Sequence, residues 1–401
     1  MINNKAAEGP IYVIIYKGCV ITKEDAHFVA SELEARDFYY HARFTSKVIL
    51  AVPDCSRKLD LSIPLKHVDH EIEVFRYSTG IIGFPLSIWR LLAKTGDIVH
   101  YDYRRGVVVG LIATFLRKKK VLVLDADITD ELAVASRNYH YPVWKRYLIG
   151  LLRHFLLAYI NISARITDMV LCVGQGPADT LDRMGLGEKT RIIIASNILL
   201  KDVIPEENVA GKWDGPLPLK IVLSAQLRYK KGIHIVLEAL KILPPESRSG
   251  FEVDVVGKGP FANELKELSR PLTGTVSFKS SVPYGSSFFN LLDEHQIAIV
   301  PQLSNEQPRV ILDAMARGLL VIASDTSGNR TIIQHKQNGL LYNRTSPEEL
   351  ANLLIEVLAQ AEHRPDYLIE MALKGRRFAA THTCDAVHAE RDRILMAMLE
   401  N

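Results

Sequence analysis

The chain has 401 residues, too many for one ordinary core, so its length predicts about two domains of common size. Apolar residues make up 48% and charged residues 24%, an ordinary globular composition that excludes a long disordered region. The formal net charge is +3, from 49 basic and 46 acidic residues, and this balance argues against a nucleic-acid-binding protein.

The amino terminus carries Lys5 but only a short strand-like run at residues 11–16, too short for the apolar core of a signal peptide. The four cysteines are far apart in sequence and form no C-x-x-C pair, so neither a zinc cluster nor a disulfide framework is indicated. We therefore expect a protein of the reducing cytoplasm.

Short apolar runs rich in β-branched residues alternate with helix-length segments along the first half of the chain. Runs of this kind are typical of strands buried on both faces of a parallel sheet. The same alternation restarts after residue 217, which predicts a second domain of the same class. The expected strands cover residues 11–16, 47–52, 97–103, 121–127, 169–174 and 191–196, then 219–225, 251–257, 275–280, 297–302 and 319–324.

The expected fold is α/β, with two doubly wound Rossmann-like domains in series. We assign residues 1–196 to the first domain and 218–372 to the second. Residues 197–217 carry prolines and glycines without a clear period, which indicates a linker. A carboxyl-terminal helix over 373–401 is expected to cross back to the first domain. In such open sheets ligands bind at the carboxyl ends of the strands, here a cleft between the domains.

The segment 141–160, YPVWKRYLIGLLRHFLLAYI, mixes aromatic, basic and leucine residues. Because Arg153 and His154 interrupt it, we do not expect it to span a bilayer. Two interpretations stay open. One is a helix packed within the first domain. The other is an interfacial helix that contacts a membrane peripherally, since aromatic and basic side chains favour the headgroup zone.

The segment 304–333, SNEQPRVILDAMARGLLVIASDTSGNRTII, predicts a helix of about ten residues after a strand that ends at Gln302. Pro308 suits the first turn, Asn305 or Glu306 can cap it, and Gly318 ends it. Its amino terminus should point into the cleft, where free amides suit a diphosphate or a sugar hydroxyl.

Two acids of this segment, Glu306 and Asp313, are seven residues apart. Seven residues are about two helical turns, so both carboxylates can lie on one side and reach one ligand. The alternative for Glu306 is a simple helix cap, and for Asp313 a carboxylate on the helix surface.

The segment resembles the donor-site signature of retaining glycosyltransferase family 4, a Glu-x7-Glu pattern followed by Ala-Met-Ala-x-Gly. Residues 313–318, DAMARG, match its second half, which implies that Asp313 holds the nucleotide ribose. Asn305 aligns with the first acid and Glu306 follows it, so the resemblance implies that one of them supports the transferred sugar. It also implies the GT-B fold and places Pro308 and Arg309 at the donor.

Further motifs of this family follow in the expected order over about residues 219–358. In SAQLRYKKG (224–232), Lys231 matches a lysine that neutralises the donor diphosphate. Gln226 stands at the position of the family arginine, and Arg228 is a candidate replacement. VVGKGP (255–260) resembles a turn in which Gly257 and Gly259 allow close backbone approach to the donor.

In the first domain, Asp125-Ala126-Asp127 follows an expected strand. Asp-x-Asp is a metal-binding motif of a different glycosyltransferase fold that this chain does not resemble, so we expect no metal here. By its place in family 4, Asp127 or Asp125 lies near the acceptor and the reacting carbon, and we take Asp127 as the catalytic candidate. His100 and Asp102, at the end of the preceding strand, are further cleft candidates.

The resemblance implies a metal-independent enzyme that moves a hexosyl or related group, with retention, from a nucleotide diphosphate sugar to a sugar or lipid-linked acceptor. It needs no cofactor and no nucleic acid, and a cytoplasmic site at the inner face of a membrane is consistent with it. Gln226, Asn305 and Thr331 depart from the family pattern. The alternatives are therefore a catalytically impaired protein that binds a nucleotide sugar or a partner, and a sugar epimerase of the same fold.

Overall fold

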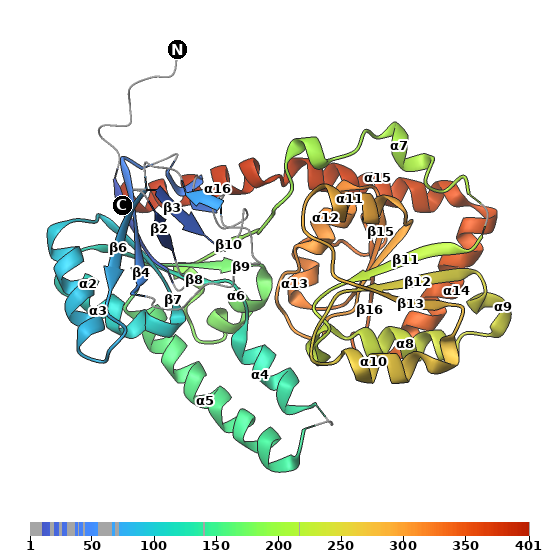
Figure 1. Ribbon diagram of the computed structural model, residues 1–401, viewed down its shortest axis with the longest axis horizontal. Helices are drawn as coiled ribbons and strands as arrows, with labels where there is room; N and C mark the ends of the chain where they lie inside the picture. Colours follow the sequence, from blue (N-terminus) through green and yellow to red (C-terminus); the bar gives the residue numbers. More distant parts are fainter. Residues whose placement is uncertain are drawn as a thin grey trace.

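The computed structural model describes residues 10–16, 20–23, 26–29, 37–38, 40–42, 45–54, 66–68, 72–138, 141–215 and 217–400. Two α/β halves lie side by side, and the last two long helices run along both of them (Figure 1). Each half is built on its own parallel sheet, as the sequence predicts.

The first half contains a seven-stranded parallel sheet in the order β10-β9-β8-β7-β1-β4-β6. Apolar side chains fill both faces, with Ile49 and Leu122 in one core cluster and Leu50 and Val121 in the other. Alternate residues of one strand therefore serve opposite faces. The strands are β1 (Ile11–Ile15), β4 (Lys47–Pro53), β6 (Ile72–Tyr77), β7 (Ile98–Asp102), β8 (Lys119–Leu124), β9 (Met169–Val173) and β10 (Thr190–Ile193).

Helices cover this sheet, and a small antiparallel sheet lies beside it. The helices are α2 (Gly83–Lys94), α3 (Gly106–Phe115), α4 (Ile128–Ser136), α5 (Val143–Arg165) and α6 (Gln175–Asp182), with 3₁₀ turns at Tyr103–Arg105 and Gly187–Lys189. The small sheet joins β2 (Ile21–Lys23), β3 (Ala26–Val29) and β5 (Lys66–Val68).

The second half contains a six-stranded parallel sheet in the order β13-β12-β11-β14-β15-β16. Its strands are β11 (Leu219–Ser224), β12 (Phe251–Val256), β13 (Val276–Lys279), β14 (Ile297–Val300), β15 (Leu320–Ser324) and β16 (Leu340–Tyr342). Its helices are α8 (Ile233–Ile242), α9 (Pro245–Arg248), α10 (Ala262–Ser269), α11 (Ser286–Asp293), α12 (Val310–Ala316), α13 (Ser327–Arg330) and α14 (Pro347–His363), with 3₁₀ turns at Tyr229–Lys231 and Arg270–Leu272.

The segment between the sheets is ordered and packs on the second half. It contains a 3₁₀ turn at Leu200–Asp202 and α7 (Glu207–Ala210). Val209 is buried in an apolar cluster with Ala372, and Arg377 forms an ion pair of 2.6 Å with Glu206. The segment therefore packs on the second half and is not a free linker.

The carboxyl-terminal region is two helices rather than the single expected one, α15 (Pro365–Thr381) and α16 (Cys384–Glu400). The helix α15 packs on α12 and β15 of the second half. The helix α16 lies against the first sheet, where Leu395 and Met398 join a core cluster. The break between them lets the chain change from one half to the other.

The helix α5 projects from the first half together with α4 (Figure 1). It is 23 residues long, and by length and composition alone it could cross a membrane, contrary to our expectation from its interrupting charges. Only 17% of its most apolar stretch is buried. The helix packs on α4 and α3, but most of its apolar stretch is not buried, so both interpretations left open by the sequence remain.

Candidate active site

A cavity of about 390 Å³ lies at the carboxyl ends of β11 and β14, next to the boundary between the halves. Two loops form it: the one after β11, and the one between β14 and α12. Six residues that the sequence predicts for the donor site or the sugar line it: Gln226, Arg228, Lys231, Glu306, Pro308 and Arg309. The tertiary structure thus brings together motifs that are 80 residues apart.

One strained position fixes the loop that carries the lysines. Gly232 has a φ of 69°, and a Cβ there would lie 1.8 Å from the carbonyl oxygen of Pro301. Only glycine, which has no Cβ, can adopt this left-handed conformation so close to a neighbouring backbone. This contact holds the loop after β11 against the end of β14, so Lys230 and Lys231 face the segment that carries Glu306.

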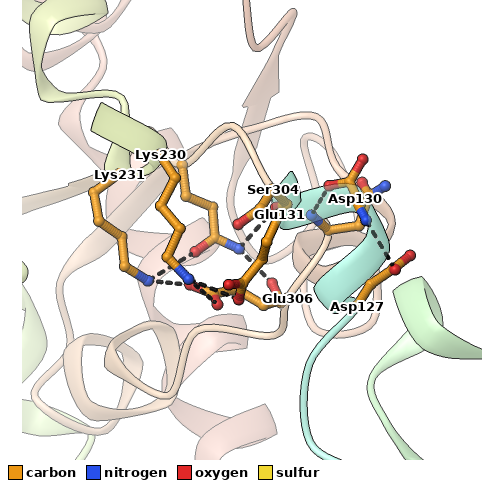
Figure 2. Close-up of polar contacts among 9 residues, drawn as sticks. Asp127, Asp130, Glu131, Lys230, Lys231, Ser304 and Glu306 are labelled. Carbon is orange, nitrogen blue, oxygen red and sulfur yellow. Dashed lines mark hydrogen bonds and ion pairs between the residues drawn. The ribbon is translucent and has the colours of Figure 1, made fainter. Parts of the chain in front are cut away.

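Glu306 is held by two ammonium groups (Figure 2). Lys231 Nζ donates to Glu306 Oε1, and Lys230 Nζ lies 3.0 Å from Glu306 Oε2. Gln302 accepts a hydrogen bond from Lys231 and donates one to the Glu306 carbonyl oxygen. Glu306 is therefore neither a helix cap nor a free acid: its carboxylate neutralises the cationic floor of the cavity.

A second acid reaches this floor from the other half of the molecule. Glu131, on α4, lies 2.7 Å from Lys230 Nζ, so Lys230 bridges Glu131 and Glu306 (Figure 2). Its neighbour Asp130 accepts a 2.7 Å hydrogen bond from the backbone amide of Asn305. The two halves are thus joined at the cavity by the first turn of α4.

The charges of this cluster depend on one another. Burial opposes ionisation of Glu306, but Lys231, Glu131 and Lys230 outweigh it and lower its pKa to about 2. Burial and the adjacent Glu306 raise the pKa of Glu131 above its usual value. Burial works against a charge on Lys230, yet Glu306 and Glu131 raise its pKa. At neutral pH Glu306 and Lys230 are therefore both charged.

The prediction that Asp127 is catalytic is not supported by its contacts. Its carboxylate is buried and caps α4, accepting from the backbone amide of Asp130 at 3.0 Å and from the Thr129 hydroxyl at 2.7 Å. Its other oxygen accepts from Thr180 at 2.8 Å. These bonds use both oxygens to fix α4, so Asp127 positions Asp130 and Glu131 instead.

The predicted helix after β14 begins later than expected. It starts at Val310 and has seven residues, so Pro308 precedes it and Glu306 lies in the loop. Asp313 therefore does not share a helix face with Glu306. Its carboxylate is 4% exposed, accepts from the Tyr284 hydroxyl at 3.0 Å and does not line the cavity. Burial raises the pKa of Asp313 to about 7, although Tyr284 and Arg309 oppose this.

Three other predicted residues also lie beside the cavity rather than in it. A Cβ on Gly257 would lie 2.0 Å from the Ala225 carbonyl oxygen, and one on Gly259 2.3 Å from that of Leu227. These glycines therefore support the loop after β11. Asn305 accepts from the Ser327 amide at 3.3 Å through its side chain, so it orders the loop that holds Glu306.

A second cavity, of about 440 Å³, lies in the first half between the strand ends and α16. His100 and Asp102 line it, as does Asp125, the other acid of the Asp-x-Asp sequence. Tyr12 is bonded through its hydroxyl to Nδ1 of His100 at 2.8 Å, and burial together with Arg391 lowers the pKa of His100 to about 3. The imidazole is therefore neutral at physiological pH.

Arg309 lines both cavities. Its guanidinium donates to Asn197 Oδ1 at 3.3 Å, in the segment that connects the two halves. Nearby, Gln307 exchanges two hydrogen bonds of 2.9 Å with the backbone of Ala195. The segment 305–309 thus lies between the two cavities and contacts both halves.

Sequence reasoning missed three residues of the charged cluster: Lys230, Glu131 and Gln302. Lys230 is adjacent to a matched residue, so the doubled lysine was an available signal. Nothing in the spacing of Glu131 pointed to residues about 100 and 175 positions later in the chain. Among the described residues, no group of three or more His, Cys, Asp and Glu side chains is arranged to hold a metal ion.

Comparison with known proteins assigns a family to the second half. Residues 215–374 match the family model described as Glycosyl transferases group 1. The amylovoran biosynthesis glycosyltransferase AmsK of Erwinia amylovora is 31% identical over 153 residues, 36% of this chain and 37% of that protein. The chain thus matches little more than a third of the length of AmsK.

Longer alignments are weaker. An Escherichia coli UDP-Gal:alpha-D-GlcNAc-diphosphoundecaprenol alpha-1,3-galactosyltransferase is 22% identical over 287 residues, 68% of this chain and 69% of that protein. Among solved structures, Anabaena HepE in complex with UDP superposes with a TM-score of 0.69 at 16% identity, over 97% of this chain and 99% of that one.

Sucrose-phosphate synthase from Thermosynechococcus elongatus gives a TM-score of 0.67 at 17% identity, over 98% of this chain and 100% of that one. At such identities the superpositions establish the fold, which confirms the predicted pair of Rossmann-like domains. Residues 215–374 are therefore a group 1 glycosyl transferase domain, and the chain as a whole has the GT-B fold.

Proposed function

We propose that this protein is a retaining glycosyltransferase of family 4, which transfers a sugar from a nucleotide diphosphate donor to an acceptor hydroxyl in polysaccharide or glycoconjugate synthesis. One observation carries the proposal. The 390 Å³ cavity in the group 1 domain has two lysines on its floor, paired with a carboxylate at the boundary between the halves. Such a cationic site suits a diphosphate leaving group, which gains negative charge as the glycosidic bond breaks.

In this proposal Lys230, Lys231 and Arg228 hold the donor diphosphate. The diphosphate would replace the carboxylates that now neutralise the lysines, first of all Glu131, which comes from the opposite half. Glu306 stays next to the sugar, where its low pKa keeps it charged. Asp313 holds the ribose only if Tyr284 releases its carboxylate.

The acceptor is assigned to the 440 Å³ cavity of the first half, which meets the donor cavity at Arg309. The names of relatives support a sugar or a lipid-linked sugar as acceptor, since the E. coli relative is a galactosyltransferase of a diphosphoundecaprenol substrate. In the transfer, the bond from the anomeric carbon to the diphosphate oxygen breaks and the bond to the acceptor oxygen forms. The acceptor proton passes to the leaving diphosphate.

We propose that no divalent metal takes part, because lysine and arginine side chains supply the positive charge at the diphosphate. A turnover assay with excess chelator tests this directly. Complete loss of activity that magnesium or manganese restores would overturn it. The anomeric configuration of the product, read by proton NMR, tests retention.

The function itself is tested in two steps. A thermal-shift screen of nucleotide diphosphate sugars identifies the donor, because a ligand that binds only the folded state raises the melting temperature. Release of nucleotide is then measured with and without acceptor sugars. Acceptor-dependent release supports the transferase. Donor binding without release favours an impaired binding protein, and conversion of the donor sugar without an acceptor favours an epimerase.

A further inference from the structure

Three helices of the first half expose apolar side chains that the proposed reaction does not use. On α5 they are Trp144, Tyr147, Leu148, Leu151, Leu152 and Phe155, with Trp144 68% and Phe155 67% exposed. Their spacing of three and four residues places them in one stripe along the helix. We refer to these six side chains as the α5 stripe.

Apolar side chains are also exposed on two other helices of this half. On α3, Leu111 and Phe115 are exposed, at 56% and 74%, and the Phe115 ring lies 5.1 Å from that of Trp89 on α2. The helices α3 and α5 pack closely because Gly106 and Gly110 of α3 meet α5 and the residue that follows it. Exposed apolar side chains thus lie on three helices, of which α3 contacts both α2 and α5.

The charged side chains of these three helices and their flanking residues are of one sign. Residues 83–94, 103–120 and 143–165 together carry twelve lysines and arginines and no aspartate or glutamate, in a chain whose totals nearly balance. Arg90 and Lys94 on α2, and Arg104 and Arg117 at the two ends of α3, are exposed. Apolar helices whose own charged side chains are all basic match an interface of acyl chains and anionic headgroups.

We propose that α2, α3 and α5 form a docking surface for an anionic lipid bilayer. The protein would bind peripherally to one leaflet and would not span the membrane. A second copy of the chain fits less well, because a symmetric contact would place two basic surfaces face to face. Spanning fits less well too. Arg153 lies in the middle of α5 and donates to the Thr129 carbonyl oxygen at 3.1 Å, and α4 packs along α5.

Docking would also bring a lipid-linked acceptor close to the cavity proposed for it. This part of the inference rests on the proposed function. The turn that precedes α3 follows Asp102, and Asp102 lines the 440 Å³ cavity. A bilayer held at α3 would therefore lie close to the cavity assigned to the acceptor, which suits a lipid-linked acceptor. The docking itself does not depend on the transfer reaction and is tested separately.

Vesicle binding of the full chain tests the surface. Vesicles of phosphatidylcholine alone are compared with vesicles containing about one-third phosphatidylglycerol, by co-sedimentation at low and high salt. We expect binding to the anionic vesicles to be at least about tenfold stronger and to weaken with salt. Equal binding to neutral vesicles, or none to either, would overturn the proposal.

Paired variants locate the contact. L151E/F155E changes α5 and L111E/F115E changes α3, and each should lower the bound fraction about tenfold or more. The matched control I242E/I355E changes two exposed isoleucines of the second half, at 49% and 38% exposure, and should bind like the wild type. Circular dichroism and donor-induced thermal shift check that each variant is folded. Folded α5 and α3 variants that bind as well as the control would refute the surface.

Tryptophan fluorescence gives a readout that does not depend on mutating the stripe to acids. Two of the three tryptophans, Trp89 and Trp144, lie on the surface, while Trp213 is buried in the second half. Lipids brominated on the acyl chains should quench the wild type and spare W89F/W144F. Quenching that persists in this variant would place the bilayer elsewhere. Resistance to alkaline carbonate extraction would indicate a spanning helix, and self-association that L151E/F155E abolishes without vesicles would indicate a second copy.

Discussion

The helices α5 and α14 show how differently the two halves use the same architecture. The helix α14 carries four glutamates on its solvent side, and six of its residues are buried in the core of the second half. The helix α5 is six residues longer and has no acid, and only Ile160, Ser163 and Ala164 are buried. The helix α14 buries its apolar side chains in the core of its own domain. The helix α5 leaves most of its apolar side chains exposed.

The two halves also differ in how closely their residues match known proteins. The second half matches a family model, and its loops form the cavity in which we propose that the donor binds. The first half shares the fold with HepE and other structures but lies almost entirely outside that match. Surfaces that meet an acceptor or a membrane are free to change with the partner, so their residue pattern need not follow the donor site.

The largest expected effect concerns Asp313, which is buried in helix α12. Folding raises its pKa from 3.8 to about 7, so the folded state holds a proton that the unfolded chain releases above about pH 4. The contribution of Asp313 to the free energy of unfolding therefore falls as the pH rises from 4 to 7. The variant Asp313→Asn has no group that titrates at this position, so it does not lose this contribution. The stability advantage of the variant should grow by up to about 4 kcal/mol between pH 4 and pH 8.

Urea unfolding at pH 4, 6 and 8 measures this advantage. Asp214→Asn, on an exposed residue near the start of the second half, is the control and should show no such trend. A constant difference between Asp313→Asn and wild type across pH would mean that Asp313 is ionised in the folded protein. In that case its proposed role as an acceptor for the ribose hydroxyls gains support.

The next effect tests the cationic floor of the donor cavity. Lys231→Ala should weaken nucleotide-sugar binding by about 1.5–3 kcal/mol, the range for charge-assisted hydrogen bonds. Calorimetry with the donor from the thermal-shift screen measures it. Lys258→Ala, an exposed lysine on a neighbouring loop, is the matched control. Unchanged affinity in Lys231→Ala would remove the donor site from this cavity.

A smaller effect, on turnover, separates Glu306 from its neighbour. Glu306→Gln keeps the shape of the side chain but removes the charge that pairs with Lys231, so turnover should fall about tenfold while bare nucleotide binds at least as well. Asn305→Ala removes contacts that order the loop and should lower thermal stability more than turnover. Full activity in Glu306→Gln would mean that the Glu306 carboxylate only neutralises Lys230 and Lys231 when no donor is bound.

The smallest effect tests the contact between the halves. Glu131→Gln removes the cross-domain ion pair with Lys230, which the donor must otherwise displace, so donor affinity should rise by up to about 1 kcal/mol. Asp179→Asn, on α6 of the same half, is a control away from the lysines. Lower affinity in Glu131→Gln would show that Glu131 helps to orient Lys230 for the donor rather than competing with it.

Much of the fold could be predicted because buried parallel strands appear as continuous apolar runs. All eleven expected strands occur in the two sheets. The missed strands of these two sheets lacked that signal: β6, at the edge of its sheet, contains Glu73 and Arg76, and β16 has three residues. The short strands of the small antiparallel sheet, β2, β3 and β5, were missed as well. The start of α12 was misjudged because Pro308 is compatible with a first helical turn and equally with the loop before one.

The sequence by itself determined the α/β class and the duplication of the domain, because local periodicity is encoded within short stretches of chain. It also predicted Lys231 and Glu306 for one site, and both line the same cavity. Only the tertiary structure decided that Asp127 caps α4, that Asp313 is buried, and that Glu131 meets Lys230. It also decided that the α5 stripe faces outward. Such pairings join residues tens to hundreds of positions apart, and their energies depend on burial and distance, which no spacing in the sequence records.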